Sequence, residues 1–293
     1  MTDRRWQVAR WAATGLVLFL GSAAIESRVA SPSAAAPPAP PKSVRLYVFD
    51  CGYFLERDNA PAAYHLTRAQ VADTRMSVPC FLIAHPKGTM IWDVGVIPDA
   101  RIGETIGGAT ATRTLTSQMA EIGYQPSDIT FLALSHAHRD HSANANTFAG
   151  STWLTPLAER DFMFAAGNPR VDPSYYDKLK TSKTIVINTD EYDVFGDATV
   201  VIKAAPGHTP GHQVVVVKLA KTGTVLLCGD LYHYPEERVL HSAPPNNEQG
   251  SVEQSAASRQ KIEDYLNKTK AKIWIEHDFL ANAKLKKSPA YYE

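Results

Sequence analysis

Three histidines and one aspartate fall within six positions of the stretch LALSHAHRDHSAN, residues 132–144. They are His136, His138, Asp140 and His141, and they come directly after an apolar run. Neutral imidazole and carboxylate groups are good ligands for zinc. In an extended loop His136 and His138 can point the same way, which leaves Asp140 and His141 for a second centre. The stretch therefore indicates a metal site rather than a polar loop.

Other histidines and aspartates also follow apolar runs that are typical of strands. They are Asp93 after TMIW, His208 after VVIKAAPG, Asp230 after VLLCG and His277 after KIWIE. Strand ends can converge at one edge of a sheet and hold ligands rigidly, while the adjoining loops admit substrate. Five histidines and two aspartates are too many for one tetrahedral ion. We therefore expect two zinc ions per chain, with a carboxylate such as Asp230 between them.

Short strands and helices alternate along the chain, and the strands are in the majority. We expect strands in residues 43–52, 78–95 (a hairpin), 128–135, 184–208, 213–232 and 271–279. We expect helices in residues 110–123, 156–166 and 253–269, with Pro156 opening the second and Gly123 ending the first. This order predicts an α/β fold in which two packed sheets carry helices on their outer faces.

The N-terminus differs in composition from the rest. A basic opening precedes residues 11–25, which carry no charge and are too short for a membrane span of about 20 residues. Residues 1–24 are predicted to be a signal peptide, with an uncleaved membrane anchor as the alternative. Residues 25–43 are rich in Ala, Pro and Ser and are predicted to be a linker to a domain at 44–293. We expect a periplasmic or secreted protein without stable membrane association after cleavage.

The bulk composition limits the choice of partners. The chain of 293 residues has 30 basic and 30 acidic residues, hence a formal net charge of zero. A nucleic-acid partner would require a basic surface that the sequence does not show, so we expect none. We expect a small-molecule substrate, and the sequence leaves the oligomeric state open, a homodimer included.

Three cysteines leave two interpretations open. An exported protein can pair Cys51 with Cys80, which fall on the first two predicted strands. Three buried thiols, Cys228 included, are the favoured interpretation, because free cysteine is commonly buried. The chain has no C-x-x-C pair, so cysteine is not the expected metal ligand.

At this point the chain resembles the metallo-β-lactamase superfamily. The resemblance rests on WDVG, the H-x-H-x-D-H pattern, PGHTPGH, CGD and IEHD, which occur in the family's order across residues 44–293. It implies an αββα sandwich of two mixed β-sheets with helices on the outer faces. It also implies one ion held by His136, His138 and His208, and a second held by Asp140, His141 and His277, with Asp230 bridging. Asp93 resembles the family's buried carboxylate behind the ligands. His212 is interpreted as structural, and His65, His85, His233 and His241 as ordinary surface or loop residues.

Within the superfamily, several stretches look like those of N-acyl homoserine lactonases. They are RLYVFDCG, VPCFLIAHPKGTMIWDVG, APGHTPGHQVVVV and GTVLLCGD. The resemblance implies a dinuclear zinc hydrolase that opens the lactone ring of N-acyl homoserine lactones, and so quenches quorum sensing, by attack of a metal-bridging hydroxide. The alternatives are a subclass-B3-like β-lactamase, another ester or thioester hydrolase of the superfamily, or a binding module with a degenerate site.

The resemblance also implies catalytic residues, with one departure. Asp140 would shuttle a proton to the leaving oxygen. The lactonases have a tyrosine three residues after the bridging aspartate, where this chain has His233 between Tyr232 and Tyr234. Tyr232 and Tyr234 are the two candidates for the contact with the substrate carbonyl. Residues 162–164 are candidates for an acyl-chain wall or for core packing. We identify no basic clamp near the motifs for the carboxylate of a β-lactam.

Overall fold

The computed structural model describes residues 38–168, 171–246 and 249–293. The predicted signal peptide, residues 1–24, and residues 25–37 of the predicted linker lie outside this part of the chain. In the described part, no helix has both the length and the apolar character needed to cross a membrane.

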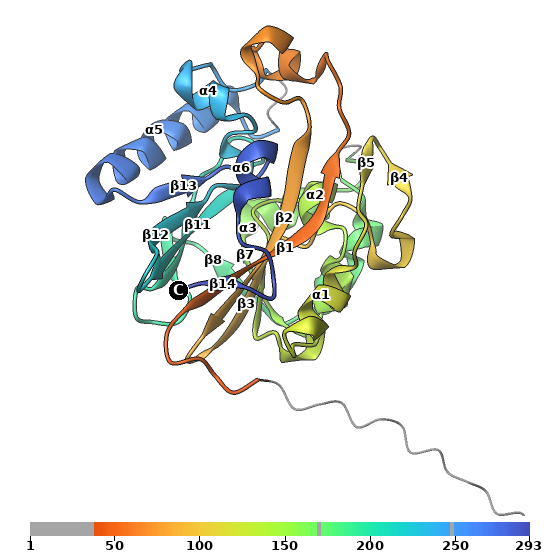
Figure 1. Ribbon diagram of the computed structural model, residues 1–293, viewed down its shortest axis with the longest axis vertical. Coiled ribbons are helices and arrows are strands. Elements are labelled where there is room, and N and C mark those ends of the chain that lie inside the picture. Colours follow the sequence, from red (N-terminus) through yellow and green to blue (C-terminus); the bar gives the residue numbers. More distant parts are fainter. Residues whose placement is uncertain (1–37, 169–170, 247–248) are drawn as a thin grey trace, which may run out of the picture. The chain divides into compact units, whose positions relative to one another are not determined.

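Two mixed sheets form the centre of the fold (Figure 1). The larger sheet contains β1 (Arg45–Phe54), β2 (Met76–His85), β3 (Gly88–Trp92), β4 (Thr105–Ile106), β5 (Ala109–Thr110), β6 (Phe131–Ala133), β7 (Thr152–Pro156), β8 (Thr184–Ile187) and β14 (Tyr291–Tyr292). Its strand order is β4-β5-β1-β2-β3-β6-β7-β8, with β14 beside β1. The smaller sheet, in the order β13-β12-β11-β10-β9, contains β9 (Glu191–Asp193), β10 (Val200–Ala204), β11 (Gln213–Leu219), β12 (Gly223–Leu227) and β13 (Lys272–Trp274). Both sheets are mixed. In the larger sheet β3, β6, β7 and β8 run parallel to one another, and in the smaller sheet β12 and β13 are parallel, while the other neighbouring strands are antiparallel.

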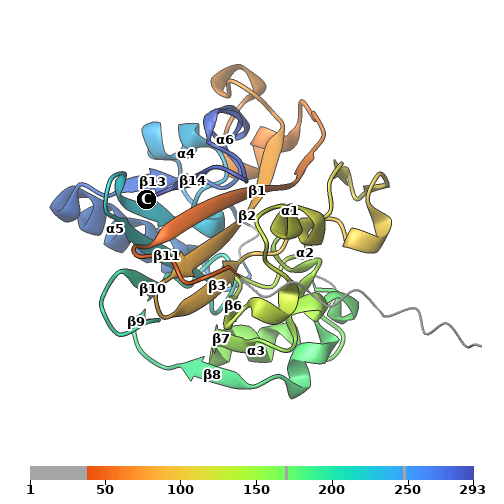
Figure 2. The same cartoon turned by 60° about the horizontal axis from the view of Figure 1, so that its bottom comes forward.

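Helices α1 (Leu115–Glu121) and α3 (Leu157–Met163) pack against the outer face of the larger sheet, and α5 (Val252–Thr269) packs against that of the smaller sheet (Figure 2). The remaining helices are the short α2 (Arg139–Ser142), α4 (Pro235–Val239) and α6 (Phe279–Lys284). The predicted helix at 110–123 is shorter than expected, because Thr114 caps its N-terminus through the amide of Ser117. It stops before Gly123, which has φ +83°. Pro156 precedes α3 as its N-cap residue.

Alternation along the strands divides the apolar side chains among three layers. Leu46 and Val48 of β1 pack between the sheets, while Tyr47 and Phe49 pack under the helices that cover the larger sheet. In the same way, Val215 and Val217 of β11 face the larger sheet, and the intervening valines contact α5. This alternation follows from the period of two in a strand. It confirms the predicted α/β sandwich.

Cys51 and Cys80 form a disulfide, so the interpretation of three free thiols is wrong. The two strands β1 and β2 are antiparallel neighbours, and a bulge after Asp50 shifts their register. The bulge brings Cys51 beside Cys80, with the two Cα atoms 5.8 Å apart, a distance that a disulfide readily spans. Cys228 is a buried free thiol, as expected.

Candidate dinuclear metal centre

All seven predicted ligands come together beside the ends of strands from both sheets. His136 and His138 follow β6, while Asp140 and His141 lie on α2, the single turn that comes next. The other three come from the smaller sheet: His208 after β10, Asp230 on the 3₁₀ turn η8 (Gly229–Leu231) after β12, and His277 after β13. They form two groups that share Asp230.

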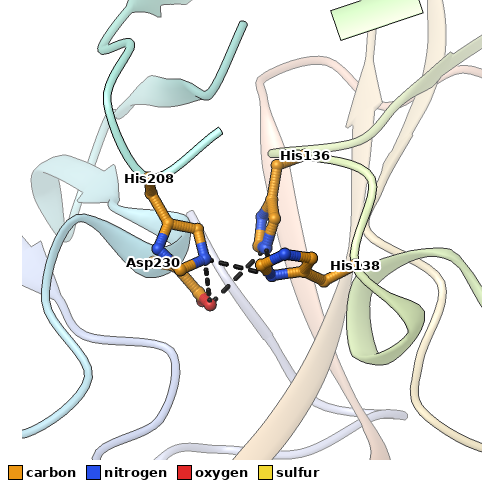
Figure 3. Close-up of side chains that lie close together, drawn as sticks. All are labelled: His136, His138, His208 and Asp230. Atoms are coloured by element: carbon orange, nitrogen blue, oxygen red, sulfur yellow. Dashed lines mark hydrogen bonds and ion pairs between the residues drawn. The ribbon is translucent and has the colours of Figure 1, made fainter. Parts of the chain in front are cut away.

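The first group consists of His136, His138, His208 and Asp230, whose ring nitrogens and carboxylate point toward one another (Figure 3). Nδ1 of His138 lies 2.8 Å from Nε2 of His136 and 3.1 Å from Nε2 of His208. Oδ2 of Asp230 lies 3.5 Å and 3.2 Å from the same two Nε2 atoms. Ligands about 2.0–2.1 Å from a tetrahedral zinc ion are roughly 3.3 Å apart, so this spacing fits one zinc-sized ion.

The second group consists of Asp140, His141, His277 and Asp230. The Nε2 atoms of His141 and His277 each lie 3.0 Å from Oδ1 of Asp230 and 3.4 Å from Oδ2 of Asp140. Oδ1 of Asp230 therefore faces the second group, while its Oδ2 faces the first. This is the arrangement of a carboxylate that bridges two ions.

Two buried atoms show that the residues fit a cation. Within the described residues, Nε2 of His141 and Oδ1 of Asp230 make no hydrogen bond, although they are 3.0 Å apart. Buried polar atoms without hydrogen bonds are costly, and a shared cation satisfies both. The His/Asp donor set is therefore consistent with a centre of two metal ions.

The electrostatics of the first group favour neutral imidazoles. Burial lowers the pKa of His136 well below its usual value and that of His138 to about 4. Neutral imidazole is the form that binds a metal ion, so these side chains are ready to ligate at neutral pH.

The second group carries a surplus of negative charge. Burial opposes ionisation of His141, but the carboxylates of Asp230, Asp140 and Asp93 together raise its pKa well above the usual value. Burial also opposes ionisation of Asp230, but the surrounding histidines, His141 first, hold its pKa well below the usual range. Without a metal ion, protons on the imidazoles of this group offset part of the charge of these carboxylates.

Asp93 holds the ring of His141 in place through the ring nitrogen that faces away from the centre. Its Oδ2 atom accepts a hydrogen bond from Nδ1 of His141 at 3.0 Å, and its Oδ1 atom accepts one from the amide of Ser135 at 2.6 Å. Nδ1 of His277 is held in the same way by the carbonyl oxygen of Ser77 at 2.8 Å. Both rings therefore present Nε2 to the centre.

His212 positions Asp230 rather than joining either group. The amide of Asp230 donates to Nε2 of His212 at 3.0 Å, and Nδ1 of His212 donates to the carbonyl oxygen of Ala205 at 2.9 Å. Burial lowers the pKa of His212 to about 3, which keeps Nε2 free to accept. The structural interpretation of His212 agrees with this geometry.

Glu159 is a supporting residue that sequence reasoning missed. This buried carboxylate on α3 accepts from the amide of Ala137 at 2.7 Å, from the hydroxyl of Thr209 at 2.7 Å and from the amide of Gly211 at 2.9 Å. It therefore ties the loop of His136 and His138 to the loop of His208. Burial raises its pKa to about 7. A single Glu on a short amphipathic helix gives no sequence signal for this role.

Tyr232 and Tyr234 are directed away from the centre. The hydroxyl of Tyr232 donates to Glu263 at 3.2 Å, and that of Tyr234 donates to the carbonyl oxygen of Thr74 at 3.1 Å. His233, between the two tyrosines, is the residue whose side chain faces Asp230 instead. The role predicted for the two tyrosines is therefore not supported by their positions.

His233 is a buried neighbour of the centre, so its interpretation as an ordinary surface or loop residue is wrong. Its Nε2 atom lies 3.1 Å from Oδ2 of Asp230. Its ring lies against Tyr64, with centroids 4.2 Å apart. His85 is buried as well and contacts Asp197, far from the centre in the fold. The signal for His233 was its position three residues after Asp230, between the two tyrosine candidates.

A cavity of about 380 Å³ lies over both groups. Besides the ligands and His233, it is lined by Phe54, Arg57, Tyr64, Met76, Arg139 and Gln249. Residues 162–164 are not among them: Met163 is fully buried in the core, and Phe162 and Phe164 pack against that core. The acyl-wall alternative for this segment is wrong, and the core interpretation is right.

Comparison with known proteins identifies the family. The model of the metallo-beta-lactamase superfamily matches residues 73–272. The chain belongs to this superfamily. An N-acyl homoserine lactone hydrolase with the product N-hexanoyl-L-homoserine bound at its catalytic metal centre is similar to this chain in structure. Its TM-score is 0.71 at 20% identity, and the match covers 85% of this chain and 99% of that protein. The dizinc lactonase AidC has a TM-score of 0.62 at 20% identity and covers 85% and 94%. These structures share the superfamily fold with this chain.

Curated relatives in the superfamily are more similar in sequence. The N-acyl homoserine lactonase AttM of Agrobacterium fabrum is 30% identical over 264 residues, which cover 82% of this chain and 97% of that protein. AttM of Azorhizobium caulinodans is 29% identical over 264 residues, covering 82% and 98%. The chain is thus a superfamily member related to lactonases, with His/Asp clusters that suit two metal ions.

Proposed function

We propose that the protein is a dinuclear zinc hydrolase that opens the ring of N-acyl homoserine lactones. One observation carries the proposal: the two oxygens of Asp230 face separate ligand groups, each completed by three further side chains. A pair of ions in such a centre is suited to hydrolysis. The names of the AttM relatives and of the dizinc lactonase AidC support the choice of substrate.

The reaction adds water to the lactone carbonyl and breaks the bond between that carbon and the ring oxygen. Two zinc ions, when bound, would lower the pKa of a water molecule and polarise the carbonyl oxygen. Asp140 lines the cavity, and nearby histidines hold its pKa well below the usual range against the effect of burial. An ionised carboxylate at this position accepts the proton of the attacking water and passes it to the departing ring oxygen.

We assign the contact with the substrate carbonyl to Tyr64. It lies at the end of the 3₁₀ turn η1 (Ala60–Tyr64) and lines the cavity beside His233. Burial, with Asp230 and Glu237 nearby, raises the pKa of its hydroxyl well above the usual value. The hydroxyl therefore keeps its proton at neutral pH and serves as a donor to the carbonyl oxygen. This assigns to Tyr64 the role first considered for Tyr232 and Tyr234.

Hydrolysis of β-lactams is the second candidate, because two arginines line the same cavity. Arg57 and Arg139 supply basic groups beside the centre, and Arg139 lies inside the H-x-H-x-D-H pattern, so the expectation of no basic group near the motifs is wrong. The carboxylate of a β-lactam would pair with such groups.

A hydrolysis panel tests the proposal. Zinc-loaded protein is assayed with N-hexanoyl homoserine lactone, a simple γ-lactone, nitrocefin and a glutathione thioester. The proposal predicts the highest kcat/KM for the acyl homoserine lactone. A higher value for nitrocefin would replace it with the β-lactamase function, and a higher value for the thioester would place the protein among thioester hydrolases.

A further inference from the structure

The cavity over the metal centre is lined by two cationic side chains, for which the described residues supply no anionic partner. Arg57 follows β1 in the loop that leads to η1, and Arg139 lies between the ligands His138 and Asp140. In the ranges that the structure describes, neither guanidinium forms an ion pair, and neither donates a side-chain hydrogen bond. Nε of Arg139 is fully shielded from solvent and makes no hydrogen bond there.

Both guanidinium groups approach the same diglycine turn. Gly107 and Gly108 join β4 to β5 at the outer edge of the larger sheet (Figure 1). A Cβ atom on Gly107 would lie 2.6 Å from Nη1 and 2.7 Å from Nη2 of Arg139, and one on Gly108 would lie 3.9 Å from Nη1 of Arg57. Any side chain at Gly107 would therefore displace the Arg139 guanidinium, and its φ of +56° also favours glycine. The turn thus makes room for two cations on one side of the cavity.

The carboxylates closest in sequence are engaged elsewhere. Glu56 and Asp58, which flank Arg57, pair with Arg68 at 3.7 Å and 3.2 Å. Asp140, which follows Arg139, directs Oδ2 toward the imidazoles of His141 and His277. Arg139 is half-buried and Arg57 is exposed, so the lack of a partner is costly mainly for Arg139. A planar guanidinium matches the two oxygens of a carboxylate.

We propose that Arg57 and Arg139 form an anion subsite that selects esters with a carboxylate several bonds away from the scissile carbonyl. The proposal rests on the lactone-hydrolase function above, because it assigns the cavity to an ester substrate. The backbone of Arg139 lies between the ligands His138 and Asp140, while its guanidinium lies against Gly107. The positive charge is therefore separated from the centre by the arginine side chain. A carboxylate at the end of a short acyl chain fits this separation.

A matched pair of lactones tests the subsite. N-succinyl homoserine lactone and N-butanoyl homoserine lactone have acyl chains of equal length, which end in a carboxylate and a methyl group respectively. We expect wild-type, zinc-loaded protein to favour the succinyl compound by about tenfold in kcat/KM, the scale of one charge-assisted hydrogen bond. R57Q and R139Q should each lower this ratio, and the double variant should abolish it. R113Q, whose arginine pairs with Glu121 on α1, is the matched control and should retain the ratio.

A binding measurement separates this proposal from the function on which it rests. The ring-opened acids of the two lactones are titrated into the zinc-loaded proteins by calorimetry, so the ratio of the two Kd values needs no turnover. A ratio that favours the succinyl acid and falls in R57Q and R139Q supports the subsite, even where neither lactone is opened and the proposed function fails. Equal Kd values in the wild type, or a preference that survives in the double variant, would overturn the subsite even where both lactones are hydrolysed. Zinc content of each variant identifies any loss that comes from the centre itself.

Discussion

Replacing Asp230 with Asn should remove one metal ion and leave the other. The amide keeps one oxygen and replaces the second with an NH₂ group, which cannot ligate a cation. In the tautomer with its proton on Nε2, His233 donates to the Oδ2 position at 3.1 Å and so holds the amide oxygen there. The NH₂ group then faces His141 and His277, the ligands of the second group. The backbone bond to His212 prevents the side chain from shifting as a whole.

The size of the effect follows from the ligands that remain. The first group keeps its three imidazoles and the amide oxygen. The second group keeps Asp140, His141 and His277 but loses both a ligand and a negative charge. Loss of a hydrogen-bonded support behind a ligand typically costs 10–100-fold in affinity, and loss of the ligand itself costs more. We therefore expect the affinity for the second ion to fall by at least about 100-fold in D230N.

Metal analysis after dialysis measures this change. Zinc per chain should fall from about two toward one in D230N, while D161N, an exposed aspartate on α3, serves as the matched control and should keep the wild-type content. Two zinc ions retained by D230N with unchanged affinity would refute the bridging role. Loss of both ions to the same extent would refute the inference that the amide spares the first group.

Three further results are expected. Y64F should lose roughly 10–100-fold in kcat on acyl homoserine lactones, because a hydrogen-bond donor to the carbonyl oxygen is removed. Y232F should lose far less, and equal losses in the two variants would contradict the role assigned to Tyr64. E159Q keeps only one acceptor oxygen for three donors, so urea denaturation should show a loss of about 1–3 kcal/mol in the free energy of unfolding. An equal loss in E253Q, at an exposed position in the first turn of α5, would argue against the role. We propose that the protein is exported, which the disulfide between β1 and β2 supports. N-terminal sequencing of protein from the producing cell should then find a chain cleaved near residue 24. An uncleaved chain in the soluble cytoplasmic fraction would contradict the proposal of export.

The ligands were predictable because each has a local sequence context. His136, Asp230 and His277 directly follow apolar runs, and such strands end at a common edge when two sheets pack together. The identity of the side chains then limits the chemistry to metal binding. The α/β sandwich followed from the same runs, because alternation in β1 and β11 divides their side chains between two layers.

The cavity wall was not predictable, because it depends on how separate segments pack. Tyr64 lies on a 3₁₀ turn remote in sequence from Asp230, and only the fold brings its ring against His233. The choice among residues 232–234 depended on the chain after η8, where Tyr232 is extended, and the sequence does not show which of the three side chains then faces Asp230. The disulfide depended on the β-bulge after Asp50, which alters the register that simple alternation predicts.

Zinc titration of the metal-free protein tests the central claim most directly. Opening of N-hexanoyl homoserine lactone is followed while zinc is added in known ratio to the chain. Because Asp230 joins two complete ligand groups, activity should rise to its maximum at about two zinc ions per chain. Full activity at one zinc per chain, or no lactone opening when both groups are occupied, would contradict the account.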